Sequence, residues 1–225
     1  MAVNVDTVYQ RVLALANKEQ RGYITPQEYN LFANQAQMDI FDQYFYDLNQ
    51  FRRLPGNDSK YADIVNTLEE KIAIFKKTQT TVSNGYLLEN ILDLYKISSV
   101  VYNSVPTTKI MEEVKYEDYV LLQSTPLLKP TGNRPQWCRA DGKIYMSHVG
   151  SNGNSVNYIK TPVKAEWNSL GTGLYVEGVD FELHPSEETK LVIKILGLAG
   201  ITLKDPGLYQ IAGAEDNKNI QQEKQ

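Results

Sequence analysis

Cysteine is almost absent from this chain, and histidine is rare. The one cysteine, Cys138, excludes an internal disulfide framework and indicates folding in a reducing cytoplasm. The two histidines, His148 and His184, stand apart, and neither has a second histidine or cysteine at the spacing of zinc ligands. We therefore expect no metal site.

Long apolar runs are missing as well. The first residues, Met-Ala-Val-Asn-Val-Asp, lack the basic region and apolar stretch of a signal peptide. No segment approaches the length of about 18 apolar residues that a membrane helix needs. We expect the protein to be neither secreted through a signal peptide nor membrane-spanning.

The chain has no excess of positive charge. Its 23 Lys and Arg residues are outnumbered by 27 Asp and Glu residues, which gives a net charge of −4. This balance argues against a protein whose main task is to grip nucleic acid through its phosphates, although DNA can still pass an acidic surface. The glycine-rich patterns that cradle phosphates are also missing, so we expect no nucleotide or other cofactor.

Residues arranged for catalysis are not evident. The neighbouring carboxylates occur as the pairs Glu112-Glu113, Glu117-Asp118 and Glu187-Glu188. Adjacent residues on a helix point about 100° apart and do not face each other, so these pairs are poor candidates for an acid and a base. The dipole at a helix start explains the third pair better. Cys138 has no histidine near it in sequence, and we expect no catalytic residue.

The strongest positive signal is the start of one long helix. Thr25 can cap it, Pro26 suits the first turn, and Glu28 stands where it can close a capping box onto Thr25. Nothing interrupts the helical pattern before Pro55. The sequence therefore predicts a helix over residues 26 to 52, roughly 40 Å long at 1.5 Å per residue.

This helix is apolar around most of its circumference. One apolar stripe and a second beside it leave only a narrow polar side, so the helix belongs in the centre of its domain or between subunits. The first stripe is Leu31, Met38, Phe41, Phe45 and Leu48. The second stripe is Tyr29, Phe32, Ala36, Ile40, Tyr44 and Phe51. Which stripe faces a neighbour stays open, and the candidate subunit-interface residues are Tyr29, Phe32, Ile40, Tyr44 and Phe51.

The remaining pattern predicts helices at both ends and strands between them. Expected helices cover residues 7–17, capped by Asp6, then 59–78, 115–122 and 186–200, with a further one after Asp205-Pro206. Expected strands cover residues 97–102, 156–160, 163–167 and 181–183, together with a hairpin over 137–146 that turns at Asp141-Gly142.

This order predicts an α+β fold with two parts. A helical bundle is built from residues 1–90 and 184–225, because neither helical half is thick enough to bury its own faces. A β-rich antiparallel module, residues 91–183, is inserted between the two halves.

Two segments resemble virion structural proteins of tailed phages, including crAss-like phages. The first is Asn17-Lys18-Glu19-Gln20-Arg21-Gly22-Tyr23-Ile24-Thr25-Pro26-Gln27-Glu28-Tyr29-Asn30, followed by the aromatic helix, and the second is Leu196-Gly197-Leu198-Ala199-Gly200-Ile201-Thr202-Leu203-Lys204-Asp205-Pro206-Gly207-Leu208. The resemblance covers about residues 17 to 51 and 181 to 225. Such proteins resemble the ring-forming adaptors of the head-to-tail connector and the tail tubular proteins. The expected β insertion fits the tubular type better.

The resemblance implies a non-enzymatic subunit of a ring, commonly of twelve copies, through which genomic DNA passes as cargo. Its implied partners are further copies of itself, the portal protein and neighbouring tail or connector proteins. The implied location is the virion, after synthesis in the cytoplasm of the bacterial host, without a membrane partner. The end of the chain, with Glu215, Ile220 and Gln225, corresponds to adaptor tails that dock on the portal, and is the candidate portal-docking tail.

Two alternatives remain open. The protein is another virion component, such as a capsid-associated, cargo-type or tail-fibre-attachment protein, or it is a tail-associated hydrolase. The hydrolase hypothesis requires the folded β module to bring His148 or His184 near a carboxylate or Cys138 in a cleft.

Overall fold

The structure is a computed structural model that describes residues 2–18, 24–53, 59–81, 86–88, 91–104, 108–169, 175–202 and 214. It has the mixed α+β fold that the sequence predicts. The chain divides into two compact units: unit 1 comprises residues 1–74 and 162–225, and unit 2 comprises residues 75–161. These boundaries differ from the predicted ones at residues 90/91 and 183/184. Glu215, Ile220 and Gln225 lie outside the described residues, as does the helix expected after Asp205.

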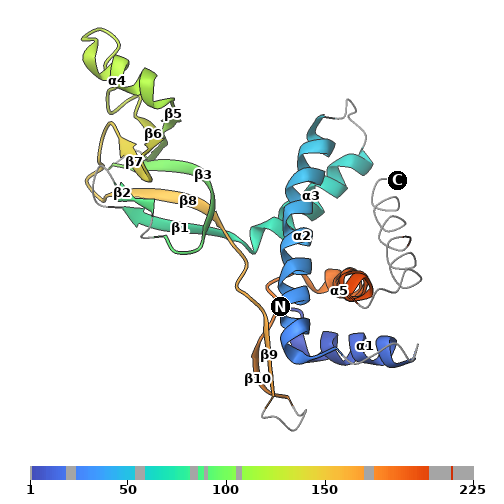
Figure 1. The fold of residues 1–225 in the computed structure, drawn as a ribbon. Coiled ribbons are helices and arrows are strands. Elements are labelled where there is room, and N and C mark those ends of the chain that lie inside the picture. Colours follow the sequence, from blue (N-terminus) through green and yellow to red (C-terminus); the bar gives the residue numbers. More distant parts are fainter. Residues whose placement is uncertain are drawn as a thin grey trace. The chain divides into compact units, whose positions relative to one another are not determined.

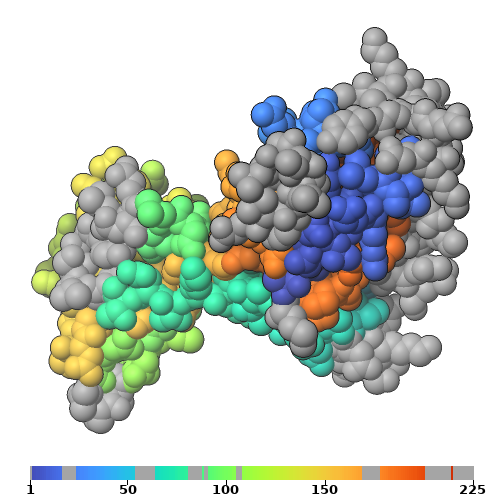
Figure 2. Space-filling view, turned by 90° about the horizontal axis from the view of Figure 1, so that it is seen from below, coloured from blue at the N-terminus to red at the C-terminus, as the bar shows by residue number. Residues whose placement is uncertain are grey.

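Unit 1 is mainly helical and takes its elements from both ends of the chain (Figure 1). Helix α2 contacts α3, α5 and β9, and α1 contacts α5, β9 and β10. In the space-filling view, α1 and α5 lie side by side on one face of this unit (Figure 2). The described elements are α1 (Val5–Lys18), α2 (Pro26–Arg53), α3 (Ser59–Ala73), β9 (Glu166–Ser169), β10 (Tyr175–Val179), η2 (Pro185–Glu187) and α5 (Glu188–Thr202).

Helix α2 begins with the predicted capping box. The backbone N–H of Glu28 donates to Thr25 Oγ1 at 3.3 Å, and the backbone N–H of Thr25 donates to Glu28 Oε2 at 3.0 Å. The hydrogen bonds from Thr25 lower the pKa of the Glu28 carboxyl. Two orphan N–H groups are thus satisfied by the two side chains, which confirms the sequence prediction of this helix start.

The second stripe of α2 is the core stripe of unit 1. Tyr29, Ile40, Tyr44 and Phe51 are at most 7% exposed, and Phe32 is half-buried. Tyr29, Ile40, Tyr44 and Phe51 therefore have little surface left for a neighbouring subunit, whereas Phe32 keeps part of its side chain accessible. The subunit interface at these five residues stays a prediction. The first stripe is mixed. Phe41 is fully buried in the core, and Leu31 is exposed. Met38, Phe45 and Leu48 are half-buried.

The start of α1 differs from the prediction. Asn4, not Asp6, caps α1, because Asn4 Oδ1 accepts from the backbone N–H of Thr7 at 3.0 Å. Asp6 instead accepts a hydrogen bond from Trp167 Nε1 at 2.9 Å. At η2 the capping position belongs to His184, whose Nδ1 accepts from the backbone N–H of Ser186 at 3.3 Å.

Three amide side chains of α2 bind the extended segment that returns from unit 2. Asn30 exchanges two hydrogen bonds with the backbone of Trp167, at 2.9 and 3.2 Å. Asn34 does the same with Ala165, at 2.8 and 2.9 Å. Gln37 Nε2 donates to the carbonyl of Val163 at 2.8 Å. This amide ladder holds residues 163–167 in unit 1, and β9 pairs with β10 rather than with the strands of unit 2.

The expected strand at residues 181–183 is not formed as such. Phe181 makes an isolated antiparallel bridge to Val3, with backbone hydrogen bonds of 3.0 and 3.2 Å in the two directions. The side chain of Asp180 adds a bond from the backbone N–H of Val5 at 2.9 Å. These contacts hold residues 3–5 against residues 180–181.

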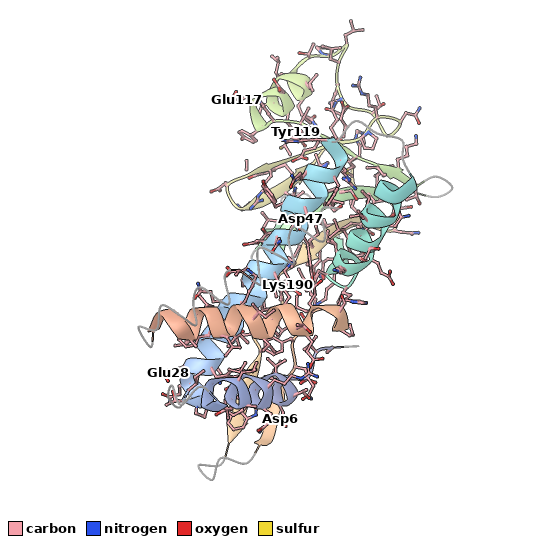
Figure 3. All side chains as sticks on the ribbon, turned by 90° about the vertical axis from the view of Figure 1, so that its right-hand side faces the viewer. Asp6, Glu28, Asp47, Glu117, Tyr119 and Lys190 are labelled. Carbon is pink, nitrogen blue, oxygen red and sulfur yellow. The ribbon has the colours of Figure 1, made fainter. Side chains whose placement is uncertain are left out.

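A partly buried ion pair joins helix α3 to η2 in unit 1. Lys71 Nζ lies 2.5 Å from Glu187 Oε1, and it also lies 5.7 Å from the ring centroid of Tyr44. The sequence explains Glu187 by the helix dipole alone. In the structure Glu187 is 2% exposed and also pairs with Lys71. Asp47 and Lys190, labelled in Figure 3, are also buried in this unit.

The described residues of unit 2 form two four-stranded sheets and one short α-helix (Figure 1). The strand orders are β1-β8-β3-β4 and β2-β7-β6-β5, and all pairs are antiparallel except β5 and β6. The parallel pair departs from the expected antiparallel module. The described elements are β1 (Lys76–Thr81), β2 (Tyr86–Leu87), β3 (Leu94–Asn103), β4 (Thr108–Ile110), β5 (Glu112–Glu113), α4 (Tyr116–Ser124), β6 (Gln136–Ala140), β7 (Lys143–Met146) and β8 (Asn154–Lys160).

Local turn chemistry explains the best-predicted part of unit 2. Asp141 and Gly142 have φ angles of 49° and 65°, as the type I′ hairpin between β6 and β7 requires. The helix expected to reach Thr78 ends at Ala73, because the following residues pair with β8 as strand β1. Apolar side chains from both sheets form one core, with Leu88, Val100, Met111, Trp137, Ile144, Met146 and Val156.

Replacing Asn34 with Ala should destabilise unit 1. The substitution leaves both the N–H and the carbonyl of Ala165 without their side-chain partner, so the free energy of unfolding should fall by about 2 to 4 kcal/mol. Urea unfolding followed by far-UV circular dichroism, which is dominated by the helices, measures this change. Gln35→Ala, one residue away on the exposed side of α2, is the control and should have little effect. Equal losses for both variants would contradict the role of the ladder.

Candidate functional site: an apolar surface around helix α4

Helix α4 is held on unit 2 by little buried surface. Tyr119 is the buried residue of the helix, which packs against β6. Figure 3 shows Tyr119 on the side of α4 toward the strands, with Glu117 away from them. Lys115 occupies the N-cap position without a side-chain hydrogen bond, and the helix ends just before Pro126. A short helix with one anchoring side chain leaves its other faces to solvent.

Those faces and the following segment carry large apolar side chains. Leu121 is 65% exposed, and Leu127, just beyond the helix, is 92% exposed. We define the α4 surface as Tyr116, Val120, Leu121, Leu127 and Leu128, all of them exposed. Single exposed apolar residues are common, whereas a group from consecutive turns of one helix and the segment after it is typical of an interaction site.

A hollow of about 520 Å³ lies between α4 and the segment that follows it. Its apolar wall is formed by Leu121, Leu122, Leu127 and Leu128. Its polar wall includes Glu112 of β5, Arg134 just before β6 and Gln136 at the start of β6. Asp118 of α4 and Lys129 also line the hollow. The hollow therefore offers both apolar contact and hydrogen-bonding groups, as binding sites commonly do.

The polar wall is organised by an ion pair. Arg134 Nε lies 3.0 Å from Glu112 Oε2, and Nη2 of the same guanidinium lies 3.4 Å from Oε1. Gln136 Nε2 donates to the same carboxylate at 3.4 Å. The hydrogen bond from Arg134, followed by that from Gln136, lowers the pKa of the Glu112 carboxyl. The parallel pairing of β5 with β6 places Glu112 opposite Gln136, which brings these groups together.

One atom of the polar wall has no partner. Gln136 is 4% exposed, and its Oε1 accepts no hydrogen bond from any described residue. A buried amide oxygen without a donor costs about 1 to 3 kcal/mol.

The residues considered for catalysis are not brought together. His148 Nδ1 lies 3.2 Å from Ser147 Oγ in unit 2, and His184 caps η2 in unit 1. Neither histidine is hydrogen-bonded to a carboxylate or to Cys138 within the described parts of the chain. Cys138 is buried in β6, and this burial raises the pKa of its thiol, which disfavours the nucleophilic thiolate. Among residues with described positions, no group of three or more His, Cys, Asp or Glu side chains is arranged to hold a metal ion.

Sequence reasoning placed the short helix correctly but missed the α4 surface. The available signal was the pair of leucine doublets, Leu121-Leu122 and Leu127-Leu128, on either side of the turn at Pro126. This pattern has no regular period, so it does not distinguish a buried segment from an exposed one. None of the described helices is both long and apolar enough to span a lipid bilayer.

Comparisons with known proteins identify no family for this chain. A scan against protein-family models finds no match, and a search of curated proteins finds no similar sequence.

Removing Arg134 should raise the pKa of Glu112. In an Arg134→Ala variant the largest cause of the lowered pKa is lost, so the carboxyl should titrate closer to its ordinary value of 4.5. Because the folded-state pKa is the lower one, the ion pair stabilises the fold above pH 4.5 and this contribution is lost as pH falls through the folded pKa. Carbon-detected NMR titration of the side chain measures the shift. Arg139→Ala, an exposed arginine farther along β6, serves as control, and an unchanged Glu112 titration in Arg134→Ala would refute the assignment.

Proposed function

We propose that this protein is a non-enzymatic virion structural protein, a ring-forming subunit of the head-to-tail connector or tail through which DNA passes. The observation that carries the proposal is the α4 surface, a group of exposed large apolar residues beside a hollow. Burial of such a surface favours association, whereas leaving it in water is unfavourable. The resemblance of residues 17–30 and 196–208 to phage virion proteins supplies the type of assembly.

The division of the chain supports the same proposal. The resemblance implies a helical part built from both chain ends and a β-rich part between them. Unit 1 is assembled from residues 1–74 and 162–225, and unit 2 is one continuous segment. In the proposed assembly unit 1 would supply the helical body and unit 2 a surface for neighbouring subunits.

The charge of the chain suits a channel for DNA. A net charge of −4 disfavours the release of counterions that drives tight binding to phosphates. DNA would then be passing cargo, with the permanent partners being other copies of the chain, the portal protein and neighbouring tail or connector proteins.

Polar substitutions on the α4 surface should impair assembly. A Leu121→Ser, Leu127→Ser variant loses two exposed apolar side chains, so its folded structure should be kept while oligomers decrease at least tenfold in population. Native mass spectrometry and negative-stain electron microscopy of the full chain, alone and with the portal protein of the same virus, measure this effect.

The matched control is Leu92→Ser, because Leu92 is 98% exposed in unit 2 but lies outside the α4 surface. This variant should assemble like the unchanged protein. A wild-type chain that stays monomeric at all concentrations and does not join the portal would exclude the ring proposal.

A further inference from the structure

We infer that unit 2 turns relative to unit 1 about a hinge formed by Ile74 and Pro162, the residues at which the chain crosses between the units. The chain leaves unit 1 after residue 74 and leaves unit 2 after residue 161. The hinge is a property of the chain itself, and it does not rest on the proposed function.

The outgoing link is one residue long. Helix α3 ends at Ala73, and strand β1 begins at Lys76. Phe75 already belongs to the pairing of unit 2, because its carbonyl accepts the backbone N–H of Lys160 at 2.8 Å. Ile74 therefore stands alone between the last helical residue of unit 1 and the first backbone hydrogen bond of unit 2.

The return link is equally short. On the unit 2 side, the backbone N–H of Thr161 donates to the carbonyl of Asp93 at 2.7 Å. On the unit 1 side, the carbonyl of Val163 accepts from Gln37 Nε2 at 2.8 Å. Pro162 stands between these two hydrogen bonds, so each anchored neighbour belongs to a different unit.

Pro162 explains why the pairing of β1 with β8 stops at this point. Phe75 and Lys160 share a hydrogen bond, and hydrogen-bonded pairs alternate along an antiparallel ladder. The next pair would need an N–H from the residue two positions beyond Lys160, which is Pro162, and proline has none. Ile74 and Pro162 thus follow the last backbone hydrogen bond of this pairing, one on each strand.

Two short links at the same end of a strand pair act as one hinge. A hinge requires only a few residues at the ends of elements that absorb a change in backbone torsion angles. The neighbours of Ile74 and Pro162 are held by the helix or by hydrogen bonds, so the change falls on these two residues. The proline ring fixes φ near about −65°, which restrains the hinge without closing it.

The hinge gives the α4 surface a range of directions. This surface belongs to unit 2, whereas the amide ladder belongs to unit 1 apart from the segment's entry at Pro162. Rotation at Ile74 and Pro162 therefore moves the α4 surface as a whole and leaves the hydrogen bonds inside each unit intact. A partner that binds the α4 surface can select one direction from this range.

Spin labels measure the motion. Double electron–electron resonance gives distance distributions for the full chain with pairs of labelled cysteines, and the native Cys138 is buried and unreactive. Gln27→Cys with Asn49→Cys reports on unit 1, Ser98→Cys with Glu117→Cys reports on unit 2, and Gln27→Cys with Glu117→Cys spans the hinge. Labelled chains are diluted into excess unlabelled protein, so that distances between copies do not contribute. The distribution across the hinge should be at least about twofold wider than either distribution within a unit.

Pro162→Gly tests the position of the hinge. Glycine removes the restraint on φ, so the distribution across the hinge should widen by a further factor of about 1.5. The matched control is Lys164→Gly, which adds backbone freedom two residues later, where the amide ladder holds Val163 and Ala165 on either side. This control should have the width of the unchanged chain, and circular dichroism checks that both variants are folded.

Two results would overturn the inference. The first is a distribution across the hinge that is no wider than those within the units. The second is equal widths for Pro162→Gly and Lys164→Gly, which would place the motion elsewhere in the chain. Pro162→Ala, which also frees φ, replaces Pro162→Gly if the glycine variant does not fold. None of these results depends on whether the chain forms rings, so the proposed function stands or falls separately.

Discussion

The amide ladder of α2 is the interaction on which the organisation of the chain depends. Asn30, Asn34 and Gln37 follow one face of the helix at spacings of four and three residues, and they bind alternate residues of an extended segment. Four helical residues rise about 6 Å and two strand residues about 6.6 Å, so the two repeats stay in step over this length. A buried extended backbone needs partners for its polar groups, and the helix supplies them where no strand does.

The ladder explains why the second apolar stripe of α2 is core. A helix fixed to residues 163–167 on one side must accept α3 and α5 on others, so little of its circumference stays free. The ion pair of Lys71 and the buried Glu187 then links α3 to η2, the short helix just before α5. Such a pair is costly to separate, because Glu187 alone would be a buried charge, and it therefore favours one arrangement of these helices over alternatives.

Local signals in the sequence predict local structure well here. Thr25, Pro26 and Glu28 act within one helical turn, and Asp141-Gly142 acts within one hairpin, so their effects depend on immediate neighbours only. The α+β class follows from the change in residue pattern along the chain. These features require no knowledge of distant contacts.

Features that depend on distant contacts were not predictable in the same way. In the sequence Asn34 is an ordinary polar residue, and only the structure shows that it binds Ala165. Residues 163–167 were predicted to belong to the β module, but in the structure they belong to unit 1 and bind α2 through the ladder. Which stripe of α2 is buried depends on the same contacts. The α4 surface was missed for the opposite reason, because its leucines have no distant partner within the described chain, and sequence reasoning expects leucine to be buried.

The antiparallel pairing of β1 with β8 has a consequence for how this chain can vary. Lys76 lies opposite Ile159, and the backbone N–H of Lys160 donates to the carbonyl of Phe75 at 2.8 Å, so the chain enters and leaves unit 2 at neighbouring points. An insertion with adjacent ends imposes little strain on its host. Evolution can therefore lengthen, shorten or exchange the inserted unit while the ladder and the helical core keep the same residues, so that binding specificity and scaffold change independently.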